Sequence, residues 1–320
     1  MKIGILDDYQ GVALQMADWA SIPGKPEIEV FHDHVAELEP LVQRLLPFDV
    51  LCIMRERTSM SAALLDRLPN LKLIASTGSR NAAIDTEAAK RHGIDVLHTG
   101  YYSTPAIELT WALILAVTRN VVAENVSVRN GGWQTTVGAD LHGKTLGVVG
   151  LGNIGSRVAQ IGRAFGMNAI AWSQNLTKEK AEASGANLVS KEEIFRQADI
   201  LSIHLILSHR TRGLVGRNEL NLMKPTAYLI NSARGPIVDE AALIETLKAR
   251  RIAGAAVDVF DLEPLPAEHP FRHLQNVLAT PHIGYCTRSL YETFYRDTVA
   301  NIRSWFLTRP WPNSSGDAAS

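Results

Sequence analysis

The sequence has few cysteines, almost no net charge and no long apolar run. Cys52 and Cys286 are the only cysteines among 320 residues, so a disulfide framework is excluded and a reducing cytoplasm is expected. The formal net charge of −1 argues against nucleic acid or an anionic membrane surface as the main partner. The longest apolar segment, residues 109–122, is too short and too polar to span a bilayer. A composition that is 46% hydrophobic and 20% charged is instead typical of a globular protein.

The chain is long enough for two domains, and its apolar segments form two series in which strands and helices alternate. In the first series we expect strands over 2–6, 28–31, 49–54, 71–76 and 94–97, and helices over 12–19, 35–46, 61–68 and 86–92. In the second series we expect strands over 146–149, 169–172, 200–204, 227–231, 254–259 and 277–279, and helices over 155–165, 178–183, 191–196, 216–222 and 240–249. One long helix is expected between the series, over 105–129. Such alternation predicts an α/β protein with two doubly wound parallel sheets.

A closing amphipathic helix is expected over residues 288–307, where apolar residues recur at helical spacing. Because the second series already has a full set of strands, we expect this helix to return to the first domain. One predicted domain is therefore discontinuous, with residues 1–103 plus 284–320, and the other comprises residues 104–283. The small, polar tail 313–320 is expected to be disordered.

An apolar run of strand length, residues 146–149, meets three glycines in G-x-G-x-x-G spacing, namely Gly150, Gly152 and Gly155. The residues that follow have helical periodicity, so the glycines lie between a strand and a helix. In that context the first glycine permits a tight turn, the second lets a pyrophosphate approach the backbone, and the third allows close packing. The free N–H groups of the helix N-terminus then bind the phosphates. The segment predicts a Rossmann-type dinucleotide site.

Three polar residues follow three later strands of the second series. Arg234 comes after the strand 227–231, Glu263 after 254–259 and His282 after 277–279. In an open α/β sheet, ligands bind beyond the carboxyl ends of the strands. We therefore expect these three side chains to face the crevice that holds the dinucleotide, although each alone would more often be a surface or capping residue.

Four segments carry a family resemblance: GLGNIG at 150–155, NSARGPIVD at 231–239, AVDVFDLEP at 256–264 and TPHIG at 280–284. With these motifs the chain is similar to the D-isomer-specific 2-hydroxyacid dehydrogenases, which include phosphoglycerate dehydrogenases and glyoxylate or hydroxypyruvate reductases. The resemblance extends back through 76–85 and 106–110, so it covers nearly the whole chain. It implies a flavodoxin-like substrate domain, a Rossmann NAD(P)-binding domain, and hydride transfer between NAD(P)H and a small 2-keto acid such as glyoxylate or hydroxypyruvate.

By this resemblance, Arg234, Glu263 and His282 are the catalytic residues. A histidine titrates near neutrality, so it can give or take the proton of the developing alkoxide. A carboxylate beside the imidazole favours its charged form and fixes its tautomer. An arginine offers a two-pronged cation for the substrate carboxylate and can polarise the adjacent carbonyl.

The resemblance also implies substrate-binding residues in the first domain. There the turn of Gly78, Ser79 and Arg80 would give backbone N–H groups to the substrate carboxylate, as an anion-binding nest. A plain strand-to-loop turn is an equal alternative. Arg55 follows the strand 49–54 and is a further candidate for substrate binding. The alternative is that Arg55 is an arginine of the surface with no such role.

Several more residues are expected at the cofactor by the same resemblance, besides the three glycines: Asn153, Ile154, Ser232, Ala233, Asp258 and Gly284. NAD-specific members carry an acid at the end of the strand after the glycine turn, where it binds the ribose hydroxyls. Here Ser173, Gln174 and Asn175 occupy that place, and their side chains can donate hydrogen bonds to a 2′-phosphate. We therefore expect NADP, with dual use of NAD as the alternative, and no metal site.

Two other functions stay open. One is formate or phosphonate oxidation on a similar frame, but formate dehydrogenases of this superfamily have Gln in place of the catalytic glutamate, and Glu263 argues against them. The other is a corepressor-like protein that senses the dinucleotide and keeps the same three polar residues. The resemblance also favours a homodimer built about the apolar helix 105–129, for which burial within one subunit is the alternative.

Overall fold

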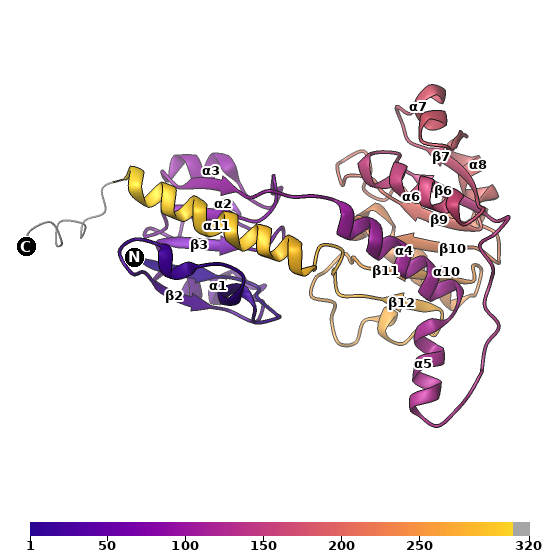
Figure 1. Cartoon of the computed structure of the whole chain (residues 1–320), viewed down its shortest axis with the longest axis horizontal. Coiled ribbons are helices and arrows are strands. Elements are labelled where there is room, and N and C mark those ends of the chain that lie inside the picture. The colour runs from indigo at the N-terminus through magenta and orange to yellow at the C-terminus, as the bar shows by residue number, and fades with distance from the viewer. Residues whose placement is uncertain (310–320) are drawn as a thin grey trace, which may run out of the picture. The chain divides into compact units, whose positions relative to one another are not determined.

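The computed structural model describes residues 1–309, so the tail 313–320 that was expected to be disordered lies outside the described residues. The chain divides into two compact units (Figure 1). The first unit is Met1–Tyr102 together with the chain from Cys286 onward, and the second unit is Ser103–Tyr285. The chain thus passes from the first unit to the second after Tyr102 and returns after Tyr285.

The first unit contains a five-stranded parallel sheet in the order β2-β1-β3-β4-β5. Its strands are β1 (Lys2–Ile5), β2 (Glu27–Val30), β3 (Val50–Ile53), β4 (Leu73–Ser76) and β5 (Asp95–His98). This is the flavodoxin-like strand order. Every residue of β3 and β4 is buried, because helices cover both faces of the sheet, and this explains their continuous apolar sequences.

Four helices accompany this sheet: α1 (Leu38–Leu45), α2 (Ala62–Leu65), α3 (Thr86–Arg91) and α11 (Arg288–Thr308). Side chains of α1, α2 and α3 share one apolar core with the strands. The long helix α11 packs against β4 and β5 in the same unit, although it comes from the far end of the sequence (Figure 1). Its buried face includes Leu290, Phe294 and Ile302.

The second unit contains a seven-stranded parallel sheet in the order β12-β11-β10-β9-β6-β7-β8. Its strands are β6 (Thr145–Val149), β7 (Asn168–Trp172), β8 (Asn187–Leu188), β9 (Ile200–Ile203), β10 (Tyr228–Asn231), β11 (Gly254–Val257) and β12 (Val277–Ala279). The order reverses between β6 and β9, as in a Rossmann sheet. The predicted fold class, two doubly wound parallel sheets of flavodoxin-like and Rossmann type, is confirmed.

Two apolar cores lie on this second sheet. One contains side chains of α4 (Thr104–Thr118) and α6 (Asn153–Ala164). The other contains side chains of α8 (Lys191–Gln197), α9 (Arg217–Leu222) and α10 (Glu240–Lys248). The short helix α7 (Lys178–Ala183) follows β7.

Two predicted helices were wrong, and one strand was missed. The helix predicted over 12–19 is replaced by two 3₁₀ turns, Ala13–Gln15 and Trp19–Ser21, because the Asp8 carboxylate accepts the amides of Val12 and Ala13 and ends the regular pattern. The helix predicted over 105–129 breaks into α4 and α5 (Val121–Arg129) at Asn120, whose φ of 53° is left-handed. The exposed edge strand β8 was not expected.

Within residues 1–309 no single helix is long and apolar enough to cross a membrane. The pair α4 and α5 reaches that length and composition only together, and it is bent by 63°.

Candidate active site

The turn between β6 and α6 requires its glycines. Gly150 has a φ of +99°, and a Cβ there would lie 2.7 Å from the carbonyl oxygen of His204. At Gly155 a Cβ would collide with the carbonyl oxygen of Gly150, so only glycine lets the helix lie this close to the strand. The helix therefore begins directly over the end of β6.

The same turn has the form that a pyrophosphate needs. A Cβ at Gly152 would meet no atom within 4 Å, so the backbone there is open to a ligand. Gly152 is the N-cap of α6 and offers no side-chain cap, which leaves the first-turn N–H groups, those of Asn153, Ile154 and Gly155, for another acceptor. These residues fit a dinucleotide, whose phosphates would bind the helix N-terminus.

The loop after β7 lies beside the glycine turn, since β7 pairs with β6. Ser173 is half-buried and its carbonyl oxygen accepts the amide of Leu176 at 3.1 Å, which shapes the loop as a turn. Gln174 and Asn175 are exposed. The loop therefore presents neutral hydrogen-bonding side chains and no carboxylate where the ribose of a bound dinucleotide is expected.

Arg234, Glu263 and His282 follow β10, β11 and β12, which are neighbours in the sheet, so all three lie at one edge. The Nδ1 atom of His282 lies 2.6 Å from the Oε2 atom of Glu263, with side chains 20% and 30% exposed. The other carboxylate oxygen of Glu263 accepts the amide of Phe260 at 3.0 Å, which fixes its orientation. The pair has the geometry of a histidine whose tautomer is set by a carboxylate.

The loop that carries His282 is held by a buried carboxylate, Asp258. One of its oxygens accepts the Thr280 hydroxyl at 2.6 Å and the Ile283 amide at 2.9 Å, and the other accepts the Gly284 amide at 2.9 Å. His282 itself has a left-handed φ of 52°, a conformation that costs energy for a residue with a side chain. Asp258 therefore stabilises the loop in which His282 adopts it. Burial raises the pKa of Asp258.

Arg234 is half-buried at the end of β10, and Asn231 fixes its backbone. The Asn231 side chain donates to the carbonyl oxygen of Arg234 at 3.1 Å and accepts the amide of Ala233 at the same distance. The guanidinium of Arg234 donates to the Ala233 carbonyl at 2.7 Å. Ser232 lies 2.9 Å from the Thr110 hydroxyl, which ties this loop to α4.

The expected substrate turn lies in the first unit, after β4. Gly78 has a φ of +89°, and a Cβ there would collide with the guanidinium of Arg55, so the position requires glycine. The amide of Gly78 donates to the Thr99 hydroxyl at 2.7 Å, and this corrects the expectation that Gly78 gives its N–H to the substrate. Within residues 1–309 the amides of Ser79 and Arg80 have no hydrogen-bond partner, and they are the two that an anion could use.

Arg55 is half-buried, and hydrogen bonds hold its backbone. Its φ is 54°, its amide donates to the Thr77 hydroxyl at 2.8 Å, and its carbonyl oxygen accepts the Asn81 side chain. Its guanidinium carbon lies 5.0 Å from the centre of the Tyr101 ring, within the range of a cation–π contact. A left-handed residue held on both sides of its backbone is typical of a functional position.

Sequence reasoning missed several residues that shape these sites. Thr99 and Tyr101 follow an expected strand, and their place at its carboxyl end was the signal that could have found them. His204 also follows a strand, and its Nε2 lies 2.8 Å from the Ser202 hydroxyl. Desolvation lowers the pKa of His204 to about 4, so the ring is neutral at physiological pH.

Comparisons with known proteins agree with this geometry. Residues 111–284 match the family model described as D-isomer specific 2-hydroxyacid dehydrogenase, NAD binding domain. The chain is 45% identical over 235 residues to a glyoxylate reductase of Aeropyrum pernix, with 70% of each chain covered. It is also similar to the crystal structure of a phosphoglycerate oxidoreductase from Vibrio cholerae O395, with a TM-score of 0.91, 38% identity, and 97% of this chain and 100% of that chain covered.

Some relatives are longer. A D-3-phosphoglycerate dehydrogenase of Bacillus subtilis is 39% identical over 264 residues, which make up 82% of this chain and 49% of the relative. The chain therefore spans about half the length of this relative.

Proposed function

The chain belongs to the D-isomer specific 2-hydroxyacid dehydrogenase family, an oxidoreductase family with an NAD-binding domain, and we propose that it reduces small 2-keto acids to D-2-hydroxy acids with Arg234, Glu263 and His282 as catalytic residues. The observation that supports this most is the 2.6 Å contact between His282 and Glu263 at the ends of adjacent strands. Two relatives are named glyoxylate reductase and hydroxypyruvate reductase, and we propose one of these two acids as the substrate.

Each of these side chains has a definite task in the reduction. The bound dinucleotide supplies the hydride. His282 donates a proton to the carbonyl oxygen from Nε2, because its Nδ1 faces Glu263. Glu263 favours the imidazolium that carries this proton, and Arg234 binds the substrate carboxylate and polarises the carbonyl beside it.

We also propose that the first unit is the substrate domain. The free amides of Ser79 and Arg80 would bind the substrate carboxylate, and the guanidinium of Arg55 would add a positive charge at the same turn. The second unit would hold the dinucleotide on Gly150, Gly152, Asn153, Ile154 and Gly155, with Ser232, Ala233, Asp258 and Gly284 on the nicotinamide side.

NADP is the proposed cofactor, with NAD accepted as well. Ser173, Gln174 and Asn175 would donate hydrogen bonds to the 2′-phosphate, and no carboxylate at these positions repels it. The two cysteines and the absence of a disulfide framework favour the cytoplasm.

A homodimer is proposed from the apolar surface around α5. The expected interface was the segment 105–129, and most apolar side chains of its first part, α4, are buried within their own unit. The exposed apolar residues lie instead on α5 and in the loop after it, where Val126 is 49% and Trp133 is 73% exposed. Glu124 holds this loop by accepting the amides and hydroxyls of Thr135 and Thr136. An ordered loop that exposes a tryptophan is typical of an interface with another copy.

A spectrophotometric panel tests the proposed function. The purified protein is mixed with glyoxylate, hydroxypyruvate or pyruvate and with NADPH or NADH, and oxidation of the nicotinamide is followed at its near-ultraviolet absorbance. We expect turnover with at least one acid and none after His282→Ala. A protein that binds the dinucleotide but turns over none of these acids would instead support a sensor of the corepressor kind.

A further inference from the structure

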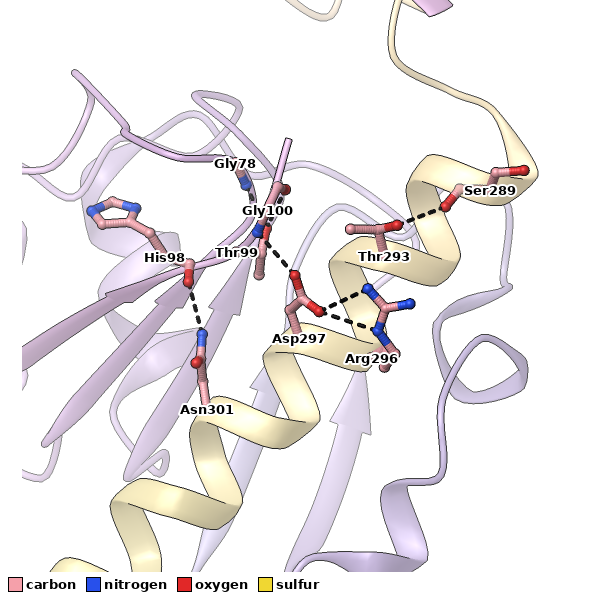
Figure 2. A network of polar contacts seen from close by, with 9 residues as sticks. All are labelled: Gly78, His98, Thr99, Gly100, Ser289, Thr293, Arg296, Asp297 and Asn301. Atoms are coloured by element: carbon pink, nitrogen blue, oxygen red, sulfur yellow. Dashed lines mark hydrogen bonds and ion pairs between the residues drawn. The ribbon is translucent and has the colours of Figure 1, made fainter. Parts of the chain in front are cut away.

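Three consecutive residues at the carboxyl end of β5 each contact a different part of the first unit. The Thr99 hydroxyl accepts the amide of Gly78 at 2.7 Å, in the turn after β4 (Figure 2). The amide of Gly100 donates to Oδ2 of Asp297, on α11, at 2.9 Å (Figure 2). The ring of Tyr101 lies 5.0 Å from the guanidinium carbon of Arg55. Segment 99–101 thus contacts both the proposed substrate turn and the arginine beside it.

The hydroxyl of Thr99 acts both as a hydrogen-bond donor and as a hydrogen-bond acceptor. It donates its proton to the carbonyl oxygen of Gly100 at 3.1 Å, so a lone pair remains for the amide of Gly78. Thr99 is buried, and the amide of Gly78 would be buried without a partner if this oxygen were removed. The contact therefore fixes the first residue of the turn and leaves the amides of Ser79 and Arg80 for a ligand.

Asp297 anchors this segment from α11. A Cβ at Gly100 would lie 3.1 Å from Oδ2 of Asp297, so a larger residue there would push this carboxylate away by a few tenths of an ångström. The other carboxylate oxygen accepts two N–H groups of Arg296, at 3.1 and 3.2 Å, which orients the carboxylate (Figure 2). One helical turn later Asn301 donates to the carbonyl oxygen of His98 at 2.9 Å, so α11 binds the end of β5 at two points (Figure 2).

We propose that Thr99 and Asp297 are positioning residues for substrate binding. Asp297 fixes segment 99–101, Thr99 fixes Gly78, and the turn is thereby held in the form whose next two amides bind the substrate carboxylate. The inference rests on the proposed function, since it assigns these residues to the same reaction. Its physical basis is preorganisation: a binding group that is already in place loses little entropy when the ligand binds, and a small displacement weakens binding strongly.

Steady-state kinetics with the 2-keto acid that the parent protein turns over best tests this inference. Thr99→Val removes the hydroxyl with little change in volume, and Thr99→Ser restores it. Asp297→Ala removes the carboxylate, and Asp297→Asn keeps one oxygen that can accept the amide of Gly100. We expect the KM for the keto acid to rise about tenfold or more in Thr99→Val and Asp297→Ala. The KM for the dinucleotide should stay unchanged, kcat should change less than the KM for the keto acid, and Thr99→Ser and Asp297→Asn should approach the parent.

Asn301→Ala is the matched control, because it removes a hydrogen bond between the same helix and the same strand without touching segment 99–101. Its KM for the keto acid should equal that of the parent, even if its melting temperature falls as far as that of Asp297→Ala. Equal KM values in the parent, Thr99→Val and Asp297→Ala would overturn the inference, and so would an Asn301→Ala protein with the same raised KM.

A milder variant covers the case in which Thr99→Val or Asp297→Ala fails to fold. Gly100→Ala only displaces the Asp297 carboxylate by a few tenths of an ångström, and it should still raise the KM for the keto acid. The inference is contradicted if Gly100→Ala and Thr99→Val both fold and both keep the parent's KM for the keto acid. A parent protein that reduces no 2-keto acid contradicts the proposed function itself, which these variants do not test.

Discussion

The Nδ1 atom of His282 lies 2.6 Å from the Oε2 atom of Glu263, a separation typical of a charge-assisted hydrogen bond. Each residue follows a different strand, and the contact forms because β11 and β12 are neighbours. A carboxylate this close stabilises the protonated imidazole. The contact therefore fixes the orientation of the ring of the proposed proton donor.

Glu263→Gln should move the pH profile of reduction. Reduction needs a protonated imidazole at the proposed proton donor, so activity is lost as the pH rises and that proton is released. A glutamine side chain is neutral and stabilises an imidazolium less than a carboxylate does, so activity should be lost at a lower pH in the variant than in the parent. The measurement is kcat/KM for the keto acid across the pH range in which the parent is stable. A Glu263→Gln protein with the parent's profile would show that this carboxylate does not tune the histidine.

Asp66→Asn provides a matched control for this experiment. Asp66 lies 2.7 Å from Nε2 of His92, in an exposed carboxylate–imidazole pair of the first unit. Because this pair is not among the proposed catalytic residues, its loss should leave the pH profile of reduction where it is in the parent.

Cofactor selection should depend on Ser173. Ser173→Asp places a carboxylate where it would bind ribose hydroxyls and repel a 2′-phosphate. We expect the ratio of kcat/KM with NADPH to kcat/KM with NADH to fall about tenfold or more, which corresponds to ~1.4 kcal/mol. Equal losses with both cofactors would show that the loop after β7 does not contact this part of the dinucleotide.

The control for the added charge is Asn168→Asp. Asn168 is the first residue of β7, at the strand end opposite to Ser173, and its side chain makes only a 3.5 Å contact with the Gly143 carbonyl. A carboxylate there should leave the cofactor ratio unchanged.

The sequence predicted the elements that local patterns specify. The glycine turn, the parallel strands and the positions of Arg234, Glu263 and His282 after three strands all follow from apolar runs and their boundaries. Because parallel strands end at one edge of a sheet, residues that follow neighbouring strands come together without any knowledge of side-chain contacts. The contact between Glu263 and His282 is the direct result.

Contacts between distant segments could not be predicted in this way. The hydrogen bond between Thr99 and Gly78 joins residues that are 21 positions apart in the sequence. The hydrogen bond between Gly100 and Asp297 joins residues that are 197 positions apart. The break at Asn120 also has no local signal strong enough to end an apolar helix, since it depends on a single left-handed residue. These features depend on tertiary packing, which overrides local propensity.

The proposed dimer should dissociate when charge is added to its apolar surface. Val126→Glu combined with Trp133→Ala places a charge on α5 and removes the exposed tryptophan of the following loop. We expect the parent to have the mass of a dimer by light scattering at micromolar concentration and the variant to have the mass of a monomer, because burial of an unpaired charge is costly. Leu14→Glu is the control, since Leu14 is 52% exposed in the first unit, and this variant should remain dimeric. A monomeric parent would contradict the dimer.

His204 should make the stability of the protein depend on pH. Its folded pKa is about 4, below the value of ~6.5 for an unfolded histidine. Between these two values the unfolded chain binds more protons than the folded one, so the contribution of the neutral ring is fully present above pH ~6.5 and is lost as the pH falls toward 4. Between pH 7 and pH 5 the loss should amount to as much as roughly 2 kcal/mol in the free energy of unfolding.

Denaturant titrations at pH 7 and pH 5 measure this effect in the parent and in His204→Gln, whose amide can still reach the Ser202 hydroxyl. The decrease in the free energy of unfolding from pH 7 to pH 5 should be smaller in His204→Gln than in the parent, because the variant has no ring to protonate in its unfolded state. His273→Gln removes an exposed histidine of the same unit and should behave like the parent. If His204→Gln loses as much stability as the parent between these pH values, the desolvated ring of His204 is not the group that titrates.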